Sequence, residues 1–322
     1  MNKIRKIIIA PKSIYNSRKI IKNLSSSLYQ YLILRKQNIE LKLRNGETIT
    51  VSRFLYPRVI YYSKYIENIT KDNIYLKINN KTFQLPLKEI EISRFWNIVR
   101  SLKVGWLYYK NYWEKNNVKF KHFYGSIYEV FEEESYRFLN VQNKSVLDIG
   151  AFVGDSPIYF ILKGAKEVYA IEPHPDAYNE MLENIKLNNM ENKIIPINMG
   201  ISYEKDYITI DIKDITHVAF SIFKSNNNGI KIPAGKLSDI IDKYNIDAQV
   251  LKMDCEGCEY DIILKDYDTI KEFNEIGFEY HTCNTKIPVN KLLEKLNKDF
   301  ECKFIKGGIN EKIGILHCIR KK

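Results

Sequence analysis

Long hydrophobic runs are missing from this sequence of 322 residues. No apolar segment approaches the roughly 20 residues that a helix needs to cross a bilayer, so we expect no membrane-spanning segment. A secretory signal is missing too, because the apolar stretch at residues 6–10 is short and is followed at once by Pro11 and Lys12. Both absences lead us to expect a cytoplasmic protein.

Cysteine is scarce, with five residues in an odd number. Cys255 and Cys258 form a Cys-x-x-Cys pair, but no second pair lies nearby, and the surrounding acids disfavour the thiolate that redox chemistry and zinc binding need. We therefore expect neither a zinc site nor a redox pair, and we assign no metal ligand. The odd count predicts reduced thiols, as in a cytoplasm. The cysteines are Cys255, Cys258, Cys283, Cys302 and Cys318.

Acidic residues are almost absent from residues 1–45, where eleven lysines and arginines accompany a single acid, Glu40. This segment therefore carries a net charge of +10 (eleven positive charges minus one), out of +11 for the whole chain. We treat it as a basic arm attached to a nearly neutral body. Such an arm suits an acidic partner: phospholipid head groups, nucleic acid or an acidic protein.

The arm also carries a helical pattern. Within residues 13–36, apolar residues recur at spacings of three, four and seven, which predicts one helix with an apolar stripe. One interpretation is a helix packed on its own protein. The other is a helix on an anionic membrane surface, at the inner face of the membrane. The stripe makes nucleic acid the less favoured partner. Its members are Ile14, Ile21, Leu24, Leu28 and Leu32.

Residues 46–120 predict a small β-rich or α+β domain. Alternating apolar and polar residues on both sides of Asn45-Gly46 predict a hairpin, and a second alternating pair surrounds Asn79-Asn80. All three tryptophans (Trp96, Trp106 and Trp113) lie in residues 93–120, where aromatic side chains usually fill a core or a seam between domains. A platform for stacking sugars is the alternative. The strands are predicted at 39–43, 48–51, 73–78 and 81–85.

From residue 144 onward, strands alternate with helices, which predicts an α/β domain with a mostly parallel sheet. Two further strands on either side of Gly307-Gly308 predict an antiparallel hairpin. A parallel sheet ending in such a hairpin is the class I (Rossmann-like) methyltransferase fold, which we assign to residues 121–322, with an N-terminal α+β extension before it. The alternating stretch 207–223 is an insertion after the third strand. The strands are predicted at 145–149, 167–171, 193–198, 249–253, 274–280, 300–306 and 312–319, and the helices at 155–163, 175–188, 236–244, 258–265 and 288–298.

A glycine-containing turn follows the strand that ends at Ile149. Gly150 and Gly154 allow the backbone to approach a ligand closely, and ligands of open α/β sheets bind outside the carboxyl ends of the strands. The spacing Gly-x-x-x-Gly differs from the Gly-x-Gly-x-x-Gly of dinucleotide-binding proteins. Asp148, before the first glycine, repels a pyrophosphate and attracts the amino group of a methionine moiety. The turn therefore favours S-adenosylmethionine over NAD.

The next strand ends in Glu172, 22 residues after Gly150. A carboxylate at this strand end suits both hydroxyls of a ribose, although an acid before Pro173 also serves as a helix cap. As a set, these residues predict a cofactor site. Its members are Asp148, Gly150, Ala151, Gly154, Asp155, Glu172, Asn198 and Asp254.

Acids crowd the end of the strand at 249–253. Carboxylates at a ligand mouth bind substrate hydroxyls, act as a general base or hold a cation. At the end of the following strand, Glu279 and His281 share a face because strand side chains alternate. His281 suits a general base near neutral pH, although a single histidine is more often structural. The catalytic candidates are Asp254, Glu256, Glu259, Glu279 and His281, with Asp254 as the first choice.

Residues 144–281 resemble the FkbM family of S-adenosylmethionine-dependent methyltransferases. The resemblance rests on Val-Leu-Asp-Ile-Gly-Ala-Phe-Val-Gly-Asp-Ser at 146–156, Ala-Ile-Glu-Pro at 170–173, and Leu-Lys-Met-Asp-Cys-Glu-Gly-Cys-Glu at 251–259. The last block keeps each fixed position of the family pattern Lys-x-Asp-x-Glu-Gly-x-Glu. In the block at 235–241, Ser238 departs from the more frequent Thr-Leu-Asp, and Asp239 keeps the acid.

The resemblance implies S-adenosylmethionine as cofactor and methylation of a hydroxyl on a sugar, glycolipid or other small molecule. An RNA methyltransferase that binds nucleic acid through the basic arm is the alternative. Asp254 is not followed by the Pro-Pro-aromatic cluster of base N-methylating enzymes, and no lysine closes the strand at 274–280 as ribose methylation would require. A binding module without catalysis is the third class, which the intact pocket residues disfavour.

Overall fold

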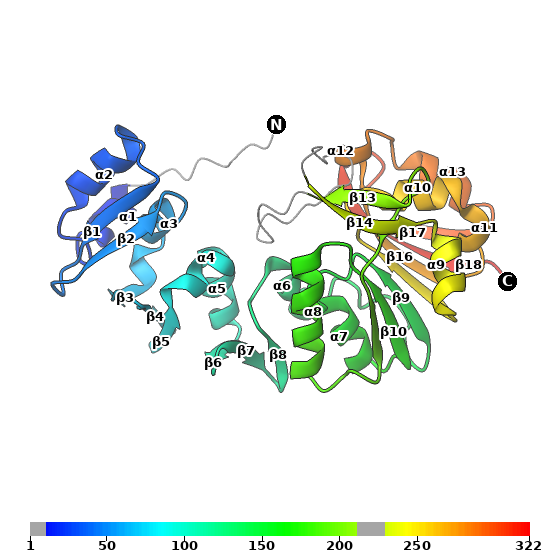
Figure 1. Cartoon of the computed structure of the whole chain (residues 1–322), viewed down its shortest axis with the longest axis horizontal. Helices are drawn as coiled ribbons and strands as arrows, with labels where there is room; N and C mark the ends of the chain where they lie inside the picture. Colours follow the sequence, from blue (N-terminus) through cyan, green and yellow to red (C-terminus); the bar gives the residue numbers. More distant parts are fainter. Residues whose placement is uncertain (1–10, 211–228) are drawn as a thin grey trace. The chain divides into compact units, whose positions relative to one another are not determined.

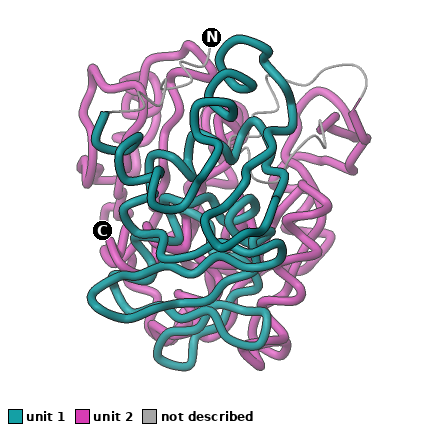
Figure 2. The backbone as a smooth tube through the Cα atoms, turned by 90° about the vertical axis from the view of Figure 1, so that its left-hand side faces the viewer, with its two compact units in different colours: residues 1–125 teal, residues 126–322 magenta. Residues whose placement is uncertain are grey.

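The computed structural model describes residues 11–210 and 229–322 and divides the chain into two compact units. Unit 1 comprises residues 1–125 and unit 2 residues 126–322 (Figure 2). The sequence placed this division between residues 120 and 121. In the described residues, no helix is long and apolar enough to cross a membrane.

Unit 2 is built on a seven-stranded sheet (Figure 1). Its strands, in the order in which they lie side by side, are β11 (Ile194–Ile197), β10 (Glu167–Ile171), β9 (Ser145–Ile149), β15 (Val250–Met253), β16 (Glu275–His281), β18 (Ile313–Arg320) and β17 (Phe300–Lys306). The strands from β11 to β16 are parallel, and β18 and β17 form the antiparallel hairpin. The predicted fold class is confirmed.

Helices connect the parallel strands. Residue 175 is a proline at the start of α8, where a missing N–H costs nothing, and His174 Nδ1 accepts the Ala177 N–H at 3.4 Å to cap the helix. Helix α7 contacts β9, β10 and β11, while α10 contacts β16 and α13 contacts β17. The helices of unit 2 are α6 (Gly125–Phe131), α7 (Asp155–Leu162), α8 (Pro175–Leu187), α9 (Leu237–Tyr244), α10 (Cys258–Lys265), α11 (Tyr267–Ile270), α12 (Thr282–Thr285) and α13 (Asn290–Leu296).

The core of unit 2 explains why these segments became parallel strands. Every residue of β9 and of β15 is buried, and both strands are mostly apolar, with Ser145, Asp148 and Lys252 as their polar members. The insertion after β11 forms a small sheet of β12 (Gly200–Ile201), β14 (Ile230–Gly235) and β13 (Tyr207–Ile210), in that order. The rest of the alternating stretch at 207–223 lies outside the described residues.

Four of the five cysteines are paired. Disulfides join Cys255 to Cys258 and Cys302 to Cys318, while Cys283 is free and exposed. The prediction of five reduced thiols is therefore wrong. Sequence spacing could not reveal that Cys302 and Cys318 are cross-strand partners of the terminal hairpin, which brings their side chains together. The reduced thiols were one argument for a cytoplasmic location, and that argument no longer holds.

Unit 1 contains small antiparallel sheets, and the predicted α+β character is correct for it. Both predicted hairpins are present, as β1 with β2 and as β4 with β5. The strands are β1 (Asn38–Lys42), β2 (Thr48–Ser52), β3 (Ile66–Ile69), β4 (Asn73–Ile78), β5 (Lys81–Pro86), β6 (Leu107–Tyr109), β7 (Tyr112–Lys115) and β8 (Val118–Phe120), and the helices are α1 (Pro11–Ser17), α2 (Leu24–Leu32), α3 (Tyr56–Tyr61), η1 (Ser63–Tyr65), α4 (Leu87–Ile92) and α5 (Phe95–Lys103).

The single helix predicted at 13–36 is wrong. Residues 20–22 leave helical geometry and pair with the end of β1, where Ile21 bridges Leu43 and the Lys22 N–H donates to the Lys42 carbonyl at 2.7 Å. Residues 20–22 therefore pair with a strand although the sequence pattern predicts a helix. Ile21 and Leu24 are buried within unit 1. The described part of the arm belongs to this unit rather than standing apart from it.

Two of the three tryptophans fill the core of unit 1, because Trp106 and Trp113 are almost fully buried and both pack against Phe123. Trp96 is exposed. The interpretation of the aromatic segment as core is therefore correct for the two buried rings.

Candidate active site

Gly150 lets two loops of unit 2 meet at the carboxyl ends of β9 and β15. It has a positive φ of 82°, and a Cβ at this position would lie 2.0 Å from the Asp254 carbonyl oxygen. The Asp254 N–H donates to the Ile149 carbonyl at 2.9 Å, so the two strand ends stay in register. The glycine predicted to admit a ligand thus first admits the neighbouring backbone, and it places Asp254 beside the glycine turn.

Asp148 has partners within the chain itself. Its side chain is fully buried, pairs with Lys252 Nζ at 2.8 Å and accepts the Ser156 hydroxyl at 2.6 Å. Lys252 Nζ also donates to the Gly150 carbonyl at 2.9 Å. The cation that Asp148 balances is therefore a lysine of the chain itself rather than the amino group of a methionine, and the pair supports the glycine turn from below.

Glu172 lies where a ribose carboxylate is expected, at the end of β10. Its two oxygens accept the N–H groups of Phe152, at 2.9 Å, and His174, at 2.7 Å. Burial raises the pKa of Glu172 to about 7, against the two backbone hydrogen bonds that lower it. Each oxygen keeps a second lone pair, so the carboxylate is held in position with capacity for two ligand hydroxyls.

The remaining cofactor candidates line the same turn. Gly154 has a φ of 86° and precedes α7, and Ala151 is buried, with its N–H on the Ile171 carbonyl. Asp155 is buried, and burial raises its pKa to about 6, against a hydrogen bond from Ser126 that lowers it. Asn198 donates to the Glu172 carbonyl at 2.8 Å and so fixes the end of β10. The turn therefore presents two buried carboxylates, Asp155 and Glu172, which fits the cationic cofactor S-adenosylmethionine.

Asp254 opens the second half of the site. Its side chain is 31% exposed, and its Oδ2 accepts the hydroxyl of Tyr136 at 3.0 Å. Burial, together with the charge of Asp254, raises the pKa of Tyr136 well above its usual range, so Tyr136 remains a hydrogen-bond donor at neutral pH. No sequence pattern distinguishes Tyr136, which lies 118 residues before its partner.

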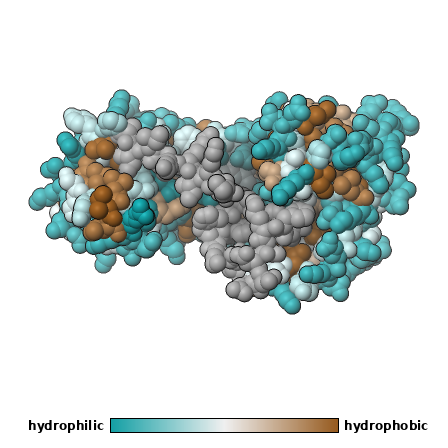
Figure 3. Space-filling model, turned by 90° about the horizontal axis from the view of Figure 1, so that it is seen from above, coloured by the Kyte–Doolittle hydropathy of each residue, from teal (hydrophilic) through white to brown (hydrophobic). Residues whose placement is uncertain are grey.

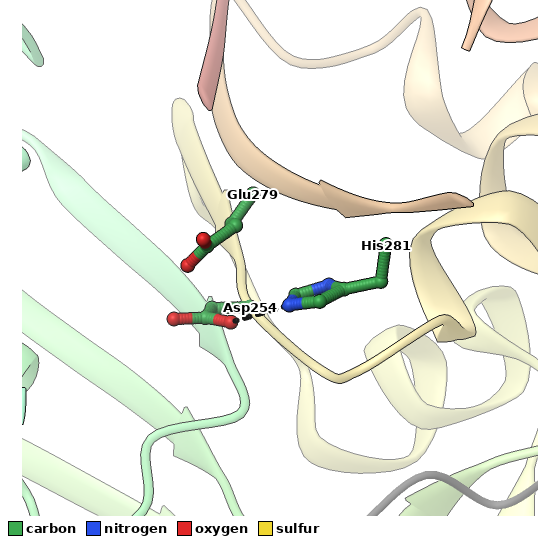
Figure 4. A group of neighbouring side chains, drawn as sticks. All are labelled: Asp254, Glu279 and His281. Carbon is green, nitrogen blue, oxygen red and sulfur yellow. Dashed lines mark ion pairs between the residues drawn. The ribbon is translucent and has the colours of Figure 1, made fainter. Parts of the chain in front are cut away.

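Glu279 and His281 face Asp254 from the end of β16, as Figure 4 shows. Burial and the charge of Asp254 raise the pKa of Glu279 to about 8. For His281, burial would lower the pKa, but the hydrogen bond and charge of Glu259, with further charge from Asp254, raise it to about 10. His281 therefore carries a proton at neutral pH, which makes it unsuited to the predicted task of general base.

Glu259 does not reach the open site. It is fully buried; its Oε1 accepts the backbone N–H and ring Nδ1–H of His281, at 2.8 and 3.1 Å, and its Oε2 accepts the Gly257 N–H at 2.8 Å. We therefore remove it from the catalytic candidates and regard it as the residue that orients His281. Glu256 is partly exposed and accepts the amide of Asn284 at 2.9 Å; burial raises its pKa.

The fold and this site together define a class of protein. A sheet in this strand order, with a glycine turn after β9 and an acid at the end of β10, is that of the class I methyltransferases. Residues 148–300 match the family model of the methyltransferase FkbM domain, which confirms the resemblance for this part of the chain. Its cofactor is S-adenosylmethionine.

Two curated relatives match short stretches. The chain is 46% identical over 55 residues to "tRNA (guanine(37)-N(1))-methyltransferase Trm5b" of Methanocaldococcus jannaschii, which covers 17% of this chain and 16% of the relative. It is 36% identical over 89 residues to "tRNA(Phe) (4-demethylwyosine(37)-C(7)) aminocarboxypropyltransferase" of the same organism, which covers 26% and 31%. The chain thus spans less than a third of the length of either relative.

Among solved structures, the chain is similar to the tRNA (m1A58) methyltransferase TrmI from Aquifex aeolicus, at 13% identity and a TM-score of 0.39, over 78% of this chain and 97% of that one. It is also similar to a putative O-methyltransferase from Klebsiella pneumoniae, at 9% identity and a TM-score of 0.37, over 56% and 74%.

We predict that Glu172→Gln weakens S-adenosylmethionine binding by about 1–3 kcal/mol, because charge-assisted hydrogen bonds to the ribose are lost. Glu172 is an acid whose pKa is raised to about 7. Its charged form is therefore present above pH 7 and is lost as the pH falls below that value. Wild-type affinity should therefore be about tenfold weaker at pH 6 than at pH 8. Calorimetry at both pH values measures this. An equal pH dependence in the Gln variant would contradict the assignment.

Proposed function

We propose that the protein transfers a methyl group from S-adenosylmethionine to a hydroxyl of a sugar, glycolipid or other small molecule. The observation that carries this proposal is the acidic mouth beside the glycine turn, formed by Asp254, Glu256 and Glu279. Carboxylates accept hydrogen bonds well, so they suit a methyl acceptor that carries several hydroxyl groups. The negative charge of Asp254 also repels the phosphates on which nucleic-acid binding depends.

The residues of the chain have the following tasks in this proposal. When bound, S-adenosylmethionine supplies an electrophilic methyl group. Glu172 and the glycine turn position it, and the acceptor oxygen is aligned for in-line attack. Asp254 removes the proton of the acceptor hydroxyl, because its side chain is open to a ligand and Tyr136 fixes one of its oxygens while Oδ1 stays available.

An RNA acceptor is the second candidate. The two curated relatives are named for tRNA, and unit 1 carries exposed basic residues in its first elements. The acidity of the mouth argues against it, since an RNA base would have to enter past carboxylates with its phosphates nearby.

An anionic membrane surface is the proposed partner of residues 1–45. Leu32, Ile33 and Leu34 are exposed together at the end of α2 and are followed by Arg35 and Lys36, a combination that suits lipid better than nucleic acid. Figure 3 shows hydrophobic surface, in brown, on unit 1 at the left of the view. A lipid-linked glycan would then be presented at the surface that the arm binds.

One assay separates these acceptors. The full chain is incubated with methyl-labelled S-adenosylmethionine and one of three pools: soluble glycans, lipid-linked glycans in anionic vesicles, or total RNA. We expect label in a glycan pool. The label should be present as a methyl ether, which base treatment does not remove. Preference for the vesicle pool that disappears at high salt supports the membrane partner. Label in RNA alone would overturn the proposed acceptor while leaving the methyltransferase activity intact.

A further inference from the structure

Three side chains of metal-ligating type meet at the mouth of the site (Figure 4). One carboxylate oxygen of Asp254, one of Glu279 and a ring nitrogen of His281 all lie within 4.8 Å of one another. Ligands around one cation at bond lengths of about 2.1 Å stand about 3–4 Å apart, so small side-chain rotations close the group onto an ion. The strands supply the positions, because Asp254 follows β15 and the other two residues end β16.

The orientation of His281 is a second and independent observation. Its side chain is only 4% exposed, and its Nδ1 donates to the fully buried Glu259 at 3.1 Å. Nε2 therefore points into the carboxylate group, 3.9 Å from Asp254 Oδ1 and 3.8 Å from Glu256 Oε2. Both distances exceed a hydrogen bond, so Nε2 has no hydrogen-bond partner among the described residues. A buried carboxylate behind a histidine, with the far nitrogen aimed at other acids, is the usual environment of a metal-bound imidazole.

The imidazolium of His281 is the one cation that the described residues place within ion-pair distance of Asp254. Neither Asp254 nor Glu279 forms an ion pair with a lysine or arginine in the part of the chain that the structure describes. Lys252, two residues before Asp254, is committed to Asp148 below the glycine turn. Carboxylates crowded together repel one another, and a divalent ion that replaces the proton of Nε2 relieves that repulsion.

From this geometry we infer that Asp254, Glu279 and His281 bind a divalent transition-metal cation at the methyl-acceptor mouth. Two carboxylates and one imidazole suit Mn²⁺ or Zn²⁺ better than Mg²⁺ or Ca²⁺, which prefer oxygen ligands alone. The inference rests on the proposed function for its role. There, open coordination positions bind the acceptor hydroxyl and ease its deprotonation, and Asp254 is both a ligand and a neighbour of the glycine turn.

Binding is tested without reference to turnover. Purified full-length protein, stripped with a chelator, is titrated with Mn²⁺, and the loss of the free-ion signal in electron paramagnetic resonance counts bound ions. We expect one saturable site per chain that Zn²⁺ displaces and Mg²⁺ does not. Pulsed measurements should detect a directly coordinated nitrogen in the wild type. This result does not require any variant to fold.

Variants assign the ligands. Glu279→Gln and His281→Gln should each weaken Mn²⁺ binding at least tenfold, and His281→Gln should also abolish the nitrogen coupling. Glu301→Gln, on the exposed side of β17, is the matched control and should bind like the wild type. Absence of saturable binding, equal binding by all variants or absence of nitrogen coupling would overturn the metal site. Methyl transfer that continues after chelation would overturn the role of the ion in deprotonating the acceptor, while the proposed function would stand.

Discussion

Asp254→Asn should leave the fold and the affinity for S-adenosylmethionine close to wild type and should reduce turnover by about 10²–10⁴-fold, the contribution typical of a general base. The variant keeps the shape of the side chain and can still accept the hydroxyl of Tyr136, which lies 3.0 Å from Oδ2. What it loses is the negative charge that takes up a proton or, in the metal site, binds a cation. The defect should therefore appear in kcat.

Single-turnover kinetics with the labelled donor and the identified acceptor measure this prediction. Asp261→Asn is the control, because Asp261 is another partly exposed acid whose partner is Lys265 on the same helix, away from the glycine turn. The control should react like the wild type. Turnover of Asp254→Asn within about tenfold of wild type, equivalent to about 1.4 kcal/mol of barrier, would show that another residue takes the proton.

The sequence predicted most of unit 2 because its signals are local. A fully buried strand such as β9 is a mostly apolar run, and the strand and helix positions agree with the structure to within a few residues. The site was predicted at the level of strand ends, since residues such as Glu172 and Asp254 follow buried strands whose carboxyl ends meet. The same reasoning placed Glu279 and His281 on one face.

What the sequence could not predict depends on contacts between distant segments. Tyr136 reaches Asp254 from the loop before β9, and nothing in its local sequence distinguishes it from the other tyrosines. The sequence argument assigned Asp148 to the amino group of the cofactor, because it considered only the ligand as a source of positive charge. In the structure, Lys252 supplies that charge. Ile21 left a helical pattern to pair with Leu43, and this preference exists only in the folded unit.

Gly150→Ala should damage the domain more than any other single methyl group added to the glycine turn. A Cβ at Gly150 would lie 2.0 Å from the Asp254 carbonyl oxygen and 2.7 Å from its carbon, and both atoms belong to the backbone, so no side-chain rotation relieves the contact. Residue 150 also has a φ of 82°, which costs further energy for any residue with a Cβ. Together, overpacking and backbone strain should lower the free energy of unfolding by about 3–5 kcal/mol.

Thermal unfolding measured by calorimetry tests this, with Gly308→Ala as the matched control, because a Cβ there meets nothing within 4 Å and the residue has an ordinary φ. We expect the melting temperature of the Gly150 variant to fall by about 10 °C, while the control stays within about 2 °C of wild type. Separation of the two loops should also distort the glycine turn that positions the cofactor, so S-adenosylmethionine binding should weaken even below the transition. A Gly150→Ala variant with wild-type stability and full cofactor affinity would mean that the β9 and β15 loops do not make the close contact on which the proposed site depends.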